Sequence, residues 1–234
     1  MRMRRLAAAW VGAAVLAAFP GPARGGGDAA KELQSLLREE EASKAGHKEK
    51  YFEFRKRFER LAEAHAGTEE AVTARLWLLR NTWWHKEEGT MEKRAAEIAD
   101  ALLRDAPKSK QLAGIADCHY DFAPADLDRI LQSLLDGSPH PEVRGAALHR
   151  MALRSPPERR KELLGRLKKE FADVPRRHST LGELADALLS PHDPASLAVG
   201  KPAPEIAGRT ADGKPMKLSD FKGKVVVLDF FGDW

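Results

Sequence analysis

The chain of 234 residues contains a single cysteine, Cys118. One cysteine excludes an intrachain disulfide and a pair of thiols that exchange with each other. Cys118 lies in Ile115–Tyr120, a segment with a helical pattern. A lone cysteine in such a segment is more often a small buried apolar residue than a reactive thiol. We therefore expect Cys118 to be buried and unreactive.

The chain also lacks the motifs of metal, nucleotide and hydrolase sites. His140 and His149, or His178 and His192, do not have the spacing of zinc ligands, and no His-x-x-x-His pair occurs. No glycine-rich phosphate loop and no Gly-x-Ser-x-Gly elbow is present. The sequence therefore predicts no metal ion and no other cofactor.

The charge excess is small. Residues 1–23 hold three arginines and no acid, so without them the formal charge falls from +4 to +1. A chain so close to neutrality gives no electrostatic basis for binding nucleic acid. We predict no nucleic-acid partner.

Long hydrophobic runs are confined to the N-terminus. Met1–Arg5 is basic, Leu6–Phe19 is apolar, and the small residues Gly21 and Ala23 precede a possible cleavage point. The apolar run is shorter than the roughly 20 residues that a membrane-spanning helix needs. We predict a signal peptide over 1–23, no transmembrane helix in the mature chain, and export to the periplasm or the medium. The alternative is an uncleaved N-terminal membrane anchor.

The pattern over 24–190 is helical throughout. The predicted segments are a helix beginning at Asp28, a helix over about 47–66, helices beginning after Thr68 and Thr90, and helices over about 109–120, 124–135, 141–153, 156–171 and 181–189. Helices of this length joined by short turns predict a mainly α fold, an antiparallel multi-helix array of the bundle or solenoid kind. No signature recurs at a constant spacing, so a named repeat family is not indicated.

Several helix starts are predicted from side-chain chemistry. Thr68 and Thr90 are expected N-caps, and Ser155–Glu158 and Thr180–Glu183 both match the capping box. Trp83 continues the apolar stripe of the third helix. Large aromatic residues at this spacing are more often core than ligand-binding, so we expect Trp83 in the core.

The composition changes after residue 190. A proline-rich linker is predicted over 191–203, and residues 204–234 have a strand-forming pattern. Glu205–Ile206 and Met216–Leu218 are candidate strands around a turn at Ala211–Lys214. Ser219 begins a single helical turn that Gly223 ends. The unbroken apolar run within 224–231 is typical of a buried strand of a parallel sheet.

The order of these residues resembles the entry to a thioredoxin-fold domain of the redoxin class. That class comprises the TlpA-like thiol-disulfide oxidoreductases and the alkyl hydroperoxide reductase/thiol-specific antioxidant proteins. The resemblance runs from about Leu197 to Trp234 and includes Gly200-Lys-Pro-Ala-Pro204, Leu218-Ser-Asp-Phe-Lys-Gly223 and the closing Phe231-Gly-Asp-Trp234. It implies that 204–234 is the incomplete β start of an α/β thioredoxin-like domain.

The resemblance also implies the residues of a redox site. In this family a Cys-x-x-Cys pair follows the position of Trp234, and its first thiolate attacks a disulfide or a peroxide. Asp229 matches the buried acid that relays a proton to the second thiol, and Trp234 matches the aromatic residue that flanks the first. The partners implied are disulfide-containing or thiol proteins, or peroxide. Reductase, oxidase and peroxidase activities all remain open.

The second interpretation places the function in the helical region itself. Its roughly 160 residues are enough to bury a core alone, whereas the last 38 are not. The protein would then be an exported protein-binding or scaffold module without enzymatic activity. On either interpretation we expect residues 204–234 to be poorly ordered in isolation, or to form at most a hairpin and one strand resting on the helical domain. A parallel strand needs neighbours, and crossover connections supply them.

Overall fold

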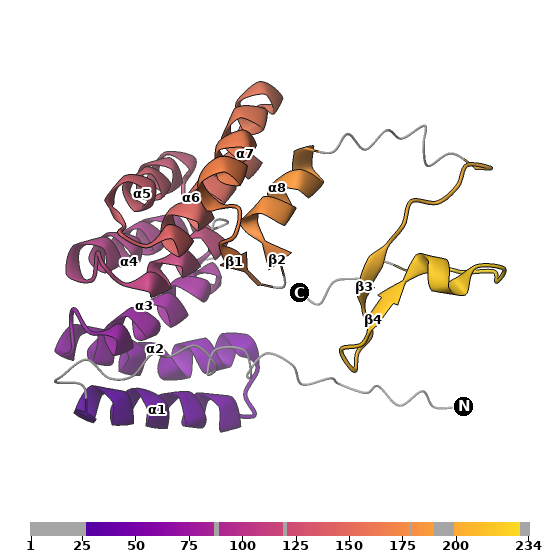
Figure 1. Cartoon of the computed structure of the whole chain (residues 1–234). Coiled ribbons are helices and arrows are strands. Elements are labelled where there is room, and N and C mark those ends of the chain that lie inside the picture. Colours follow the sequence, from indigo (N-terminus) through magenta and orange to yellow (C-terminus); the bar gives the residue numbers. More distant parts are fainter. Residues whose placement is uncertain (1–26, 87–88, 119–120, 178, 190–198, 230–234) are drawn as a thin grey trace, which may run out of the picture. The chain divides into compact units, whose positions relative to one another are not determined.

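The computed structural model describes residues 27–86, 89–118, 121–177, 179–189 and 199–229. It divides into two compact units, Met1–Leu189 and Ser190–Trp234. The predicted signal peptide and most of the predicted linker lie outside the described residues. The first unit is helical, and the second contains a small antiparallel hairpin (Figure 1). The mainly α fold predicted from the sequence is confirmed.

Helices and short 3-10 helices make up the first unit. They are α1 (Gly27–Ala42), α2 (His47–Ala64), α3 (Glu69–Arg80), the 3-10 helix η2 (Thr82–His85), α4 (Met91–Asp105), the 3-10 helix η3 (Lys110–Asp117), α5 (Pro124–Gly137), α6 (Pro141–Arg154), α7 (Pro157–Phe171) and α8 (Leu181–Leu189). Between α7 and α8, Pro175–Arg176 (β1) pairs with Ser179–Thr180 (β2) in a two-residue antiparallel bridge that the sequence did not predict.

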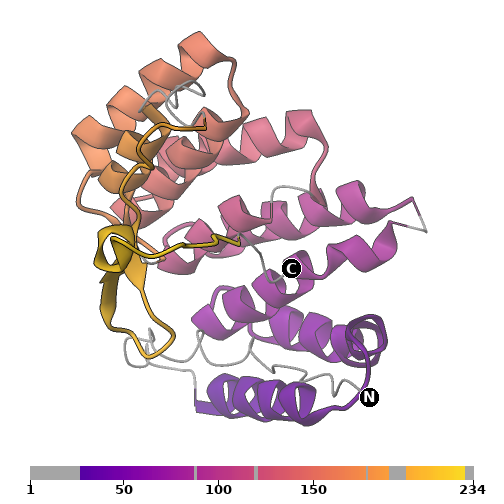
Figure 2. The same cartoon turned by 90° about the vertical axis from the view of Figure 1, so that its right-hand side faces the viewer.

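The helices are stacked in the order of the chain, from α1 to α8. Each helix packs on the next, and longer-range packing reaches mainly one element further, as between α1 and α3 or α6 and α8. Figure 2 shows this progression through the helical unit. Among the described elements the first helices have no substantial contact with the last, so the array is solenoid-like rather than a closed bundle.

Two hydrophobic clusters share α3. One side of α3 contributes Ala74 and Leu78 to a cluster with α1 and α2, and the other side contributes Val72, Leu76 and Leu79 to a cluster that extends to α8. A helix packed on both sides buries nearly its whole circumference. The buried residues of α3 are Ala71, Val72, Thr73, Ala74, Arg75, Leu76, Leu78 and Leu79.

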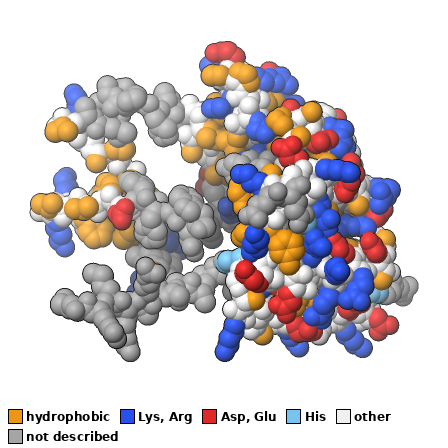
Figure 3. Space-filling view, turned by 180° about the vertical axis from the view of Figure 1, so that it is seen from behind, with side chains coloured by type: hydrophobic (Ala, Val, Ile, Leu, Met, Phe, Trp, Pro, Cys, Tyr) orange, Lys and Arg blue, Asp and Glu red, His pale blue; other side chains and the backbone are white. Residues whose placement is uncertain are grey.

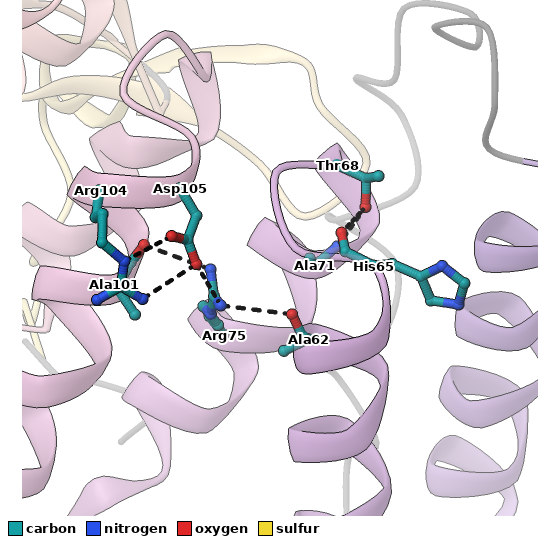
Figure 4. A network of polar contacts seen from close by, with 8 residues as sticks. All are labelled: Ala62, His65, Thr68, Ala71, Arg75, Ala101, Arg104 and Asp105. Carbon is teal, nitrogen blue, oxygen red and sulfur yellow. Dashed lines mark hydrogen bonds and ion pairs between the residues drawn. The ribbon is translucent and has the colours of Figure 1, made fainter.

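A charged residue is buried inside this central helix. Arg75 of α3 lies between Ala62 of α2 and Asp105 of α4 (Figure 4). Its Nη2 is 2.7 Å from Asp105 Oδ2, and its guanidinium also donates to the carbonyls of Ala62 and Ala101, each over 3.4 Å. Hydrogen bonds from Arg104 and then Arg75 lower the pKa of Asp105. The guanidinium of Arg75 in α3 therefore bonds to both neighbouring helices, α2 and α4.

Two of the four predicted caps form. Thr68 Oγ1 accepts a hydrogen bond from the Ala71 amide. Thr180 and Glu183 make the reciprocal capping box, with the Thr180 amide donating to Glu183 Oε2 over 2.9 Å and the Glu183 amide to Thr180 Oγ1 over 3.2 Å. Gly67 ends the turn before α3 with a positive φ of 86°, a conformation that glycine adopts without strain.

The other two predicted capping hydrogen bonds are absent. Thr90 is the N-cap residue of α4, as predicted, but its side chain makes no capping hydrogen bond. Ser155 donates instead to the Met151 carbonyl of the preceding helix over 2.8 Å, and Pro156 is the N-cap of α7. The hydroxyl of Ser155 therefore bonds to the last turn of α6, and Pro156, which has no side-chain acceptor, takes the N-cap position of α7.

The second unit is a hairpin followed by an extended segment. Strand β3 (Ala207–Arg209) pairs antiparallel with β4 (Pro215–Lys217). Strand β4 is shifted by one residue from its predicted position, and β3 directly follows the predicted strand Glu205–Ile206 without overlapping it. Gly213 has a φ of 82° in the connecting turn, and the 3-10 helix η6 (Leu218–Phe221) is followed by Gly223 with a φ of 84°. The predicted turn and single helical turn are both present.

The predicted buried strand after Gly223 is not formed. Val225–Asp229 forms no strand, and no described residue makes a backbone hydrogen bond to it. Val225 is 98% exposed and Val227 is 89% exposed. A segment with a strand-forming sequence becomes a strand only when a neighbouring strand pairs with its backbone, and the hairpin provides no such partner.

The surface of the helical unit mixes charges of both signs. Figure 3 shows acidic and basic side chains interspersed over one face, without a single large field of either sign. Ion pairs between neighbouring helices, such as Arg129 with Asp100 at 2.7 Å, contribute to this pattern. Within the part of the chain that the structure describes, no helix has the length and apolar character to cross a membrane.

Candidate functional site

An open hollow of about 610 Å³ lies in the helical unit, where the end of α3 meets the end of η3. Its lining residues come from two stretches of the sequence that are more than thirty residues apart. They are Arg80, Trp83, Asp117, Cys118 and Asp121. The hollow therefore brings together two acids, one base, one aromatic ring and the single thiol.

The way α3 ends explains why the Trp83 side chain is exposed. The helix ends at Arg80, and Thr82–His85 continues as the tighter 3-10 helix η2, in which Thr82 Oγ1 donates to the Leu79 carbonyl over 2.8 Å. This change of helix period turns Trp83 away from the stripe formed by Val72, Leu76 and Leu79. Trp83 is 47% exposed, so the expectation that it belongs to the core is wrong.

One face of the exposed Trp83 ring already has a cationic neighbour. Lys86 Nζ lies 4.3 Å from the centroid of the indole ring, within the range of a cation–π contact. The adjacent Trp84 packs partly buried against the α1–α3 cluster, and His85 is buried. Of the three consecutive residues Trp83–His85, only the first borders the hollow.

Asp117 is held by two arginines from the β1–β2 bridge. Arg176 Nη2 donates to Asp117 Oδ1 over 2.6 Å, and Arg177 Nη2 donates to the same oxygen over 3.3 Å. Arg177 has a φ of 56°, a conformation that costs a non-glycine residue energy. The negative charge of Asp117 is thus compensated from outside the hollow.

Asp121 has a different environment. It is only 8% exposed, and desolvation raises the pKa of its carboxyl to about 6, while a hydrogen bond from Thr82 acts in the opposite direction. No arginine or lysine that the structure describes offsets this rise in the pKa of Asp121. The hollow therefore contains a largely ionised carboxylate at neutral pH whose charge is not balanced by a described side chain.

Arg80 is the corresponding unpaired cation. It is the last residue of α3, it is exposed, and no described residue forms an ion pair with it. Its Nη2 lies over Gly114 of η3, where a β-carbon would be 3.4 Å away. A residue without a side chain at position 114 therefore leaves room for the Arg80 guanidinium beside the hollow.

Cys118 borders the hollow but is not a nucleophile at neutral pH. It is 6% exposed, its Sγ is 3.6 Å from the Gly114 carbonyl oxygen, and desolvation raises the pKa of its thiol to about 12. A thiol reacts as its thiolate, which is scarcely populated under these conditions. The predicted burial of Cys118 is confirmed, and the raised pKa of its thiol supports the expectation that it is unreactive.

The structure does not bring the residues of the predicted redox site together with a thiol. Asp229 is exposed at the end of the extended segment, and Trp234 lies outside the described residues. Cys118 belongs to the other unit. The assignment of Asp229 as a proton relay therefore remains a prediction, and the burial that the resemblance implies for it is not present in this structure.

Sequence reasoning missed Arg80, Asp117 and Asp121. Asp117 and Asp121 are four residues apart around Cys118, a spacing that places side chains on one face of a helix. That signal was available, but the structure ends η3 at Asp117, and no spacing rule connects this region to Arg80. The described part of the chain contains no cluster of three His, Cys, Asp or Glu side chains that is able to hold a metal ion.

Comparison of the chain with protein-family models, with curated proteins and with solved structures found no match.

Proposed function

We propose that this chain is the exported, amino-terminal part of a redoxin-type thiol-disulfide oxidoreductase, with a helical unit preceding the start of a thioredoxin-like domain. The observation that carries the proposal is the order of elements in the second unit. A hairpin with Gly213 in its turn leads to η6, to Gly223 with a positive φ, and to the apolar run Val225–Leu228. The redoxin resemblance implies these elements in this order.

The chemistry proposed depends on cysteines beyond this sequence. A first cysteine directly after Trp234 would stand at the N-terminus of a helix, where unpaired amides and the helix dipole stabilise a thiolate. That thiolate attacks a disulfide or peroxide, and the second cysteine resolves the product. Asp229 would accept the proton of the second thiol once the completed sheet covers it.

The first test is the nucleotide sequence that follows codon 234. An in-frame Cys-x-x-Cys pair directly after Trp234 is the expected result. A stop codon at that point would overturn the oxidoreductase proposal for this chain.

The second test uses the extended protein and its reduction of a model disulfide. Replacing the first cysteine by serine should abolish turnover. Asp229→Asn should slow turnover by about 10-fold or more, since general acid–base groups contribute about 10²–10⁴-fold. Asp212→Asn in the exposed hairpin turn is the matched control and should leave the rate unchanged. Equal rates for the two Asp→Asn variants would remove Asp229 from the mechanism.

A second function, binding by the helical unit alone, is favoured by the solenoid-like stacking and by the exposed Trp83 beside an open hollow. Tryptophan and arginine are enriched at binding hot spots. Under this alternative the chain binds its partner without any cysteine pair. Binding by a chain that has no redox activity would separate this function from the first.

A further inference from the structure

Two of the charged side chains that line the hollow, Arg80 and Asp121, form no ion pair with a described residue. Asp117 is neutralised by Arg176 and Arg177, which leaves Arg80 and Asp121 as groups without an oppositely charged partner among the described residues. Among the described residues, one unpaired cation and one unpaired anion therefore line the same open volume.

Burial makes the lack of a partner at Asp121 costly. A carboxylate that loses water without gaining a cation is destabilised, and the residue is only 8% exposed. A ligand ammonium group would supply the missing charge. The same ammonium would be disfavoured at Arg80, whose guanidinium pairs with carboxylates in a bidentate manner.

The volume of the hollow and the exposed Trp83 ring also fit a small ligand. A volume of about 610 Å³ lies within the usual range of small-ligand sites, about 300–1,000 Å³. Trp83 offers an exposed ring at the rim, suited to an apolar side chain. An aromatic or aliphatic group against Trp83 would leave the two charged groups of the ligand to Arg80 and Asp121.

We infer that the hollow binds a zwitterionic ligand of the amino-acid or short-peptide class, with its ammonium group at Asp121, its carboxylate at Arg80 and an apolar side chain against Trp83. This site is independent of any thiol chemistry in the second unit. Because Cys118 remains a buried thiol, binding there involves no covalent step.

The test uses leucyl-leucine as the probe, titrated into the exported chain at pH 7.5 by calorimetry. N-acetyl-leucyl-leucine lacks the ammonium group, and leucyl-leucinamide lacks the carboxylate. Each capped form should bind about 10-fold or more weakly, since hydrogen bonds to charged groups are worth about 1.5–3 kcal/mol. Free leucine serves as a further arm that separates an amino-acid site from a peptide site, and binding of either kind supports the inference.

Two variants test which side chain binds the ammonium group of the ligand and which binds its carboxylate. Asp121→Asn should weaken leucyl-leucine binding by about 10-fold and lose the preference over the acetylated form, while it keeps the preference over the amide. Arg80→Gln should show the reverse pattern. Asp126→Asn and Arg159→Gln, which do not line the hollow, are the matched controls and should bind as the parent chain does.

Thermal unfolding of each variant establishes that it is folded before it is titrated. Equal affinity of the parent chain for leucyl-leucine and both capped forms would overturn the inference. So would the absence of binding by leucine and leucyl-leucine at 10 mM, roughly the weakest affinity that such contacts would give. Unchanged binding by both Asp121→Asn and Arg80→Gln would show that the ligand lies elsewhere.

Discussion

Two helical glycines have opposite surroundings. A β-carbon on Gly182, in the first turn of α8, would lie 2.9 Å from the Ala172 carbonyl oxygen and 3.1 Å from its α-carbon. A β-carbon on Gly165 in α7 would meet nothing within 4 Å. The backbone at Ala172 is not free to move aside, because its carbonyl accepts a hydrogen bond from the Gly182 amide over 3.0 Å.

The substitution of alanine at these two positions should therefore have opposite effects. Gly182→Ala should lower the free energy of unfolding by about 1–3 kcal/mol through overpacking. Gly165→Ala should raise it by about 0.5–1 kcal/mol, because alanine has the higher helix propensity. Urea unfolding measures both changes. A stabilising Gly182→Ala would mean that α7 and α8 are less closely packed than described.

Two titrating residues of the helical unit act on stability in opposite directions. Burial raises the pKa of Asp121 from 3.8 to about 6, so the folded state holds this proton more tightly and stability falls as the pH rises through that window. For His149, desolvation and then Arg150 and Arg176 lower the pKa from 6.5 to about 4. The unfolded state binds that proton more tightly, so stability rises with pH between about 4 and 6.5.

The two slopes should nearly cancel in the parent chain, and single substitutions should separate them. Relative to the parent, Asp121→Asn should gain stability from pH 4 to pH 7, and His149→Gln should gain stability as the pH falls from 7 to 4. Each effect should stay below about 3 kcal/mol, the full equivalent of these pKa shifts, because solvent screens both groups in part. Unfolding in urea at a series of pH values measures the slopes. Parallel stability curves for the parent and both variants would contradict this account.

At the scale of elements, the contact between α3 and α4 depends on a buried charge. The Arg75 side chain is 10% exposed and bonds to Asp105, whose side chain is 17% exposed. Arg104 bonds to the same carboxylate at 2.8 Å, but its side chain is 69% exposed. Asp105 therefore forms ion pairs with one buried arginine, Arg75, and one exposed arginine, Arg104.

Arg75→Ala should cost about 3–5 kcal/mol, the usual effect of removing one partner of a buried pair. Arg104→Ala should cost less than about 1 kcal/mol, because water screens an exposed pair. Thermal unfolding with matched buffers measures both. Equal losses would show that water reaches the Arg75 pair as readily as the Arg104 pair.

Most helices were predictable because their signals are local. Apolar spacing and the proline at the start of α5 and α6 fixed those helices to within two residues of their observed bounds. The predictions failed where a side chain had a choice of partners, as at Ser155, or where the helix type changed, as at Lys110–Asp117, which is a 3-10 helix. Neither helix propensity nor a capping pattern predicts the hydrogen bond that Ser155 makes or the 3-10 form of this helix.

At the scale of the whole molecule, the two units should differ in local stability. The amides of α3 lie between two hydrophobic clusters, whereas Val225–Asp229 has no backbone hydrogen bond to a described residue. Hydrogen exchange at pH 7 should show the strongest protection in Val72–Leu79 and essentially none in Val225–Leu228. Strong protection of Val225–Leu228 in this chain would mean that the segment has strand partners.

The hollow was not predictable from the sequence for a related reason. Its two walls, Arg80 with Trp83 and Asp117 with Asp121, are adjacent only because η3 packs between α3 and α6. The burial that sets the pKa of Asp121 is likewise a property of the packed array and not of its neighbours in sequence. Local patterns predict elements, whereas sites that join distant elements require the packing itself.

The exposed run Val225–Leu228 has a consequence for self-association. Uncharged, β-branched segments without a partner strand are the starting points of intermolecular β-sheets. Lys222 and Lys224 precede the run and Asp229 follows it, so charged side chains stand at both of its ends. Such flanking charges act as gatekeepers that oppose stacking of identical chains. Asp229 therefore protects the solubility of the chain whether or not it ever relays a proton.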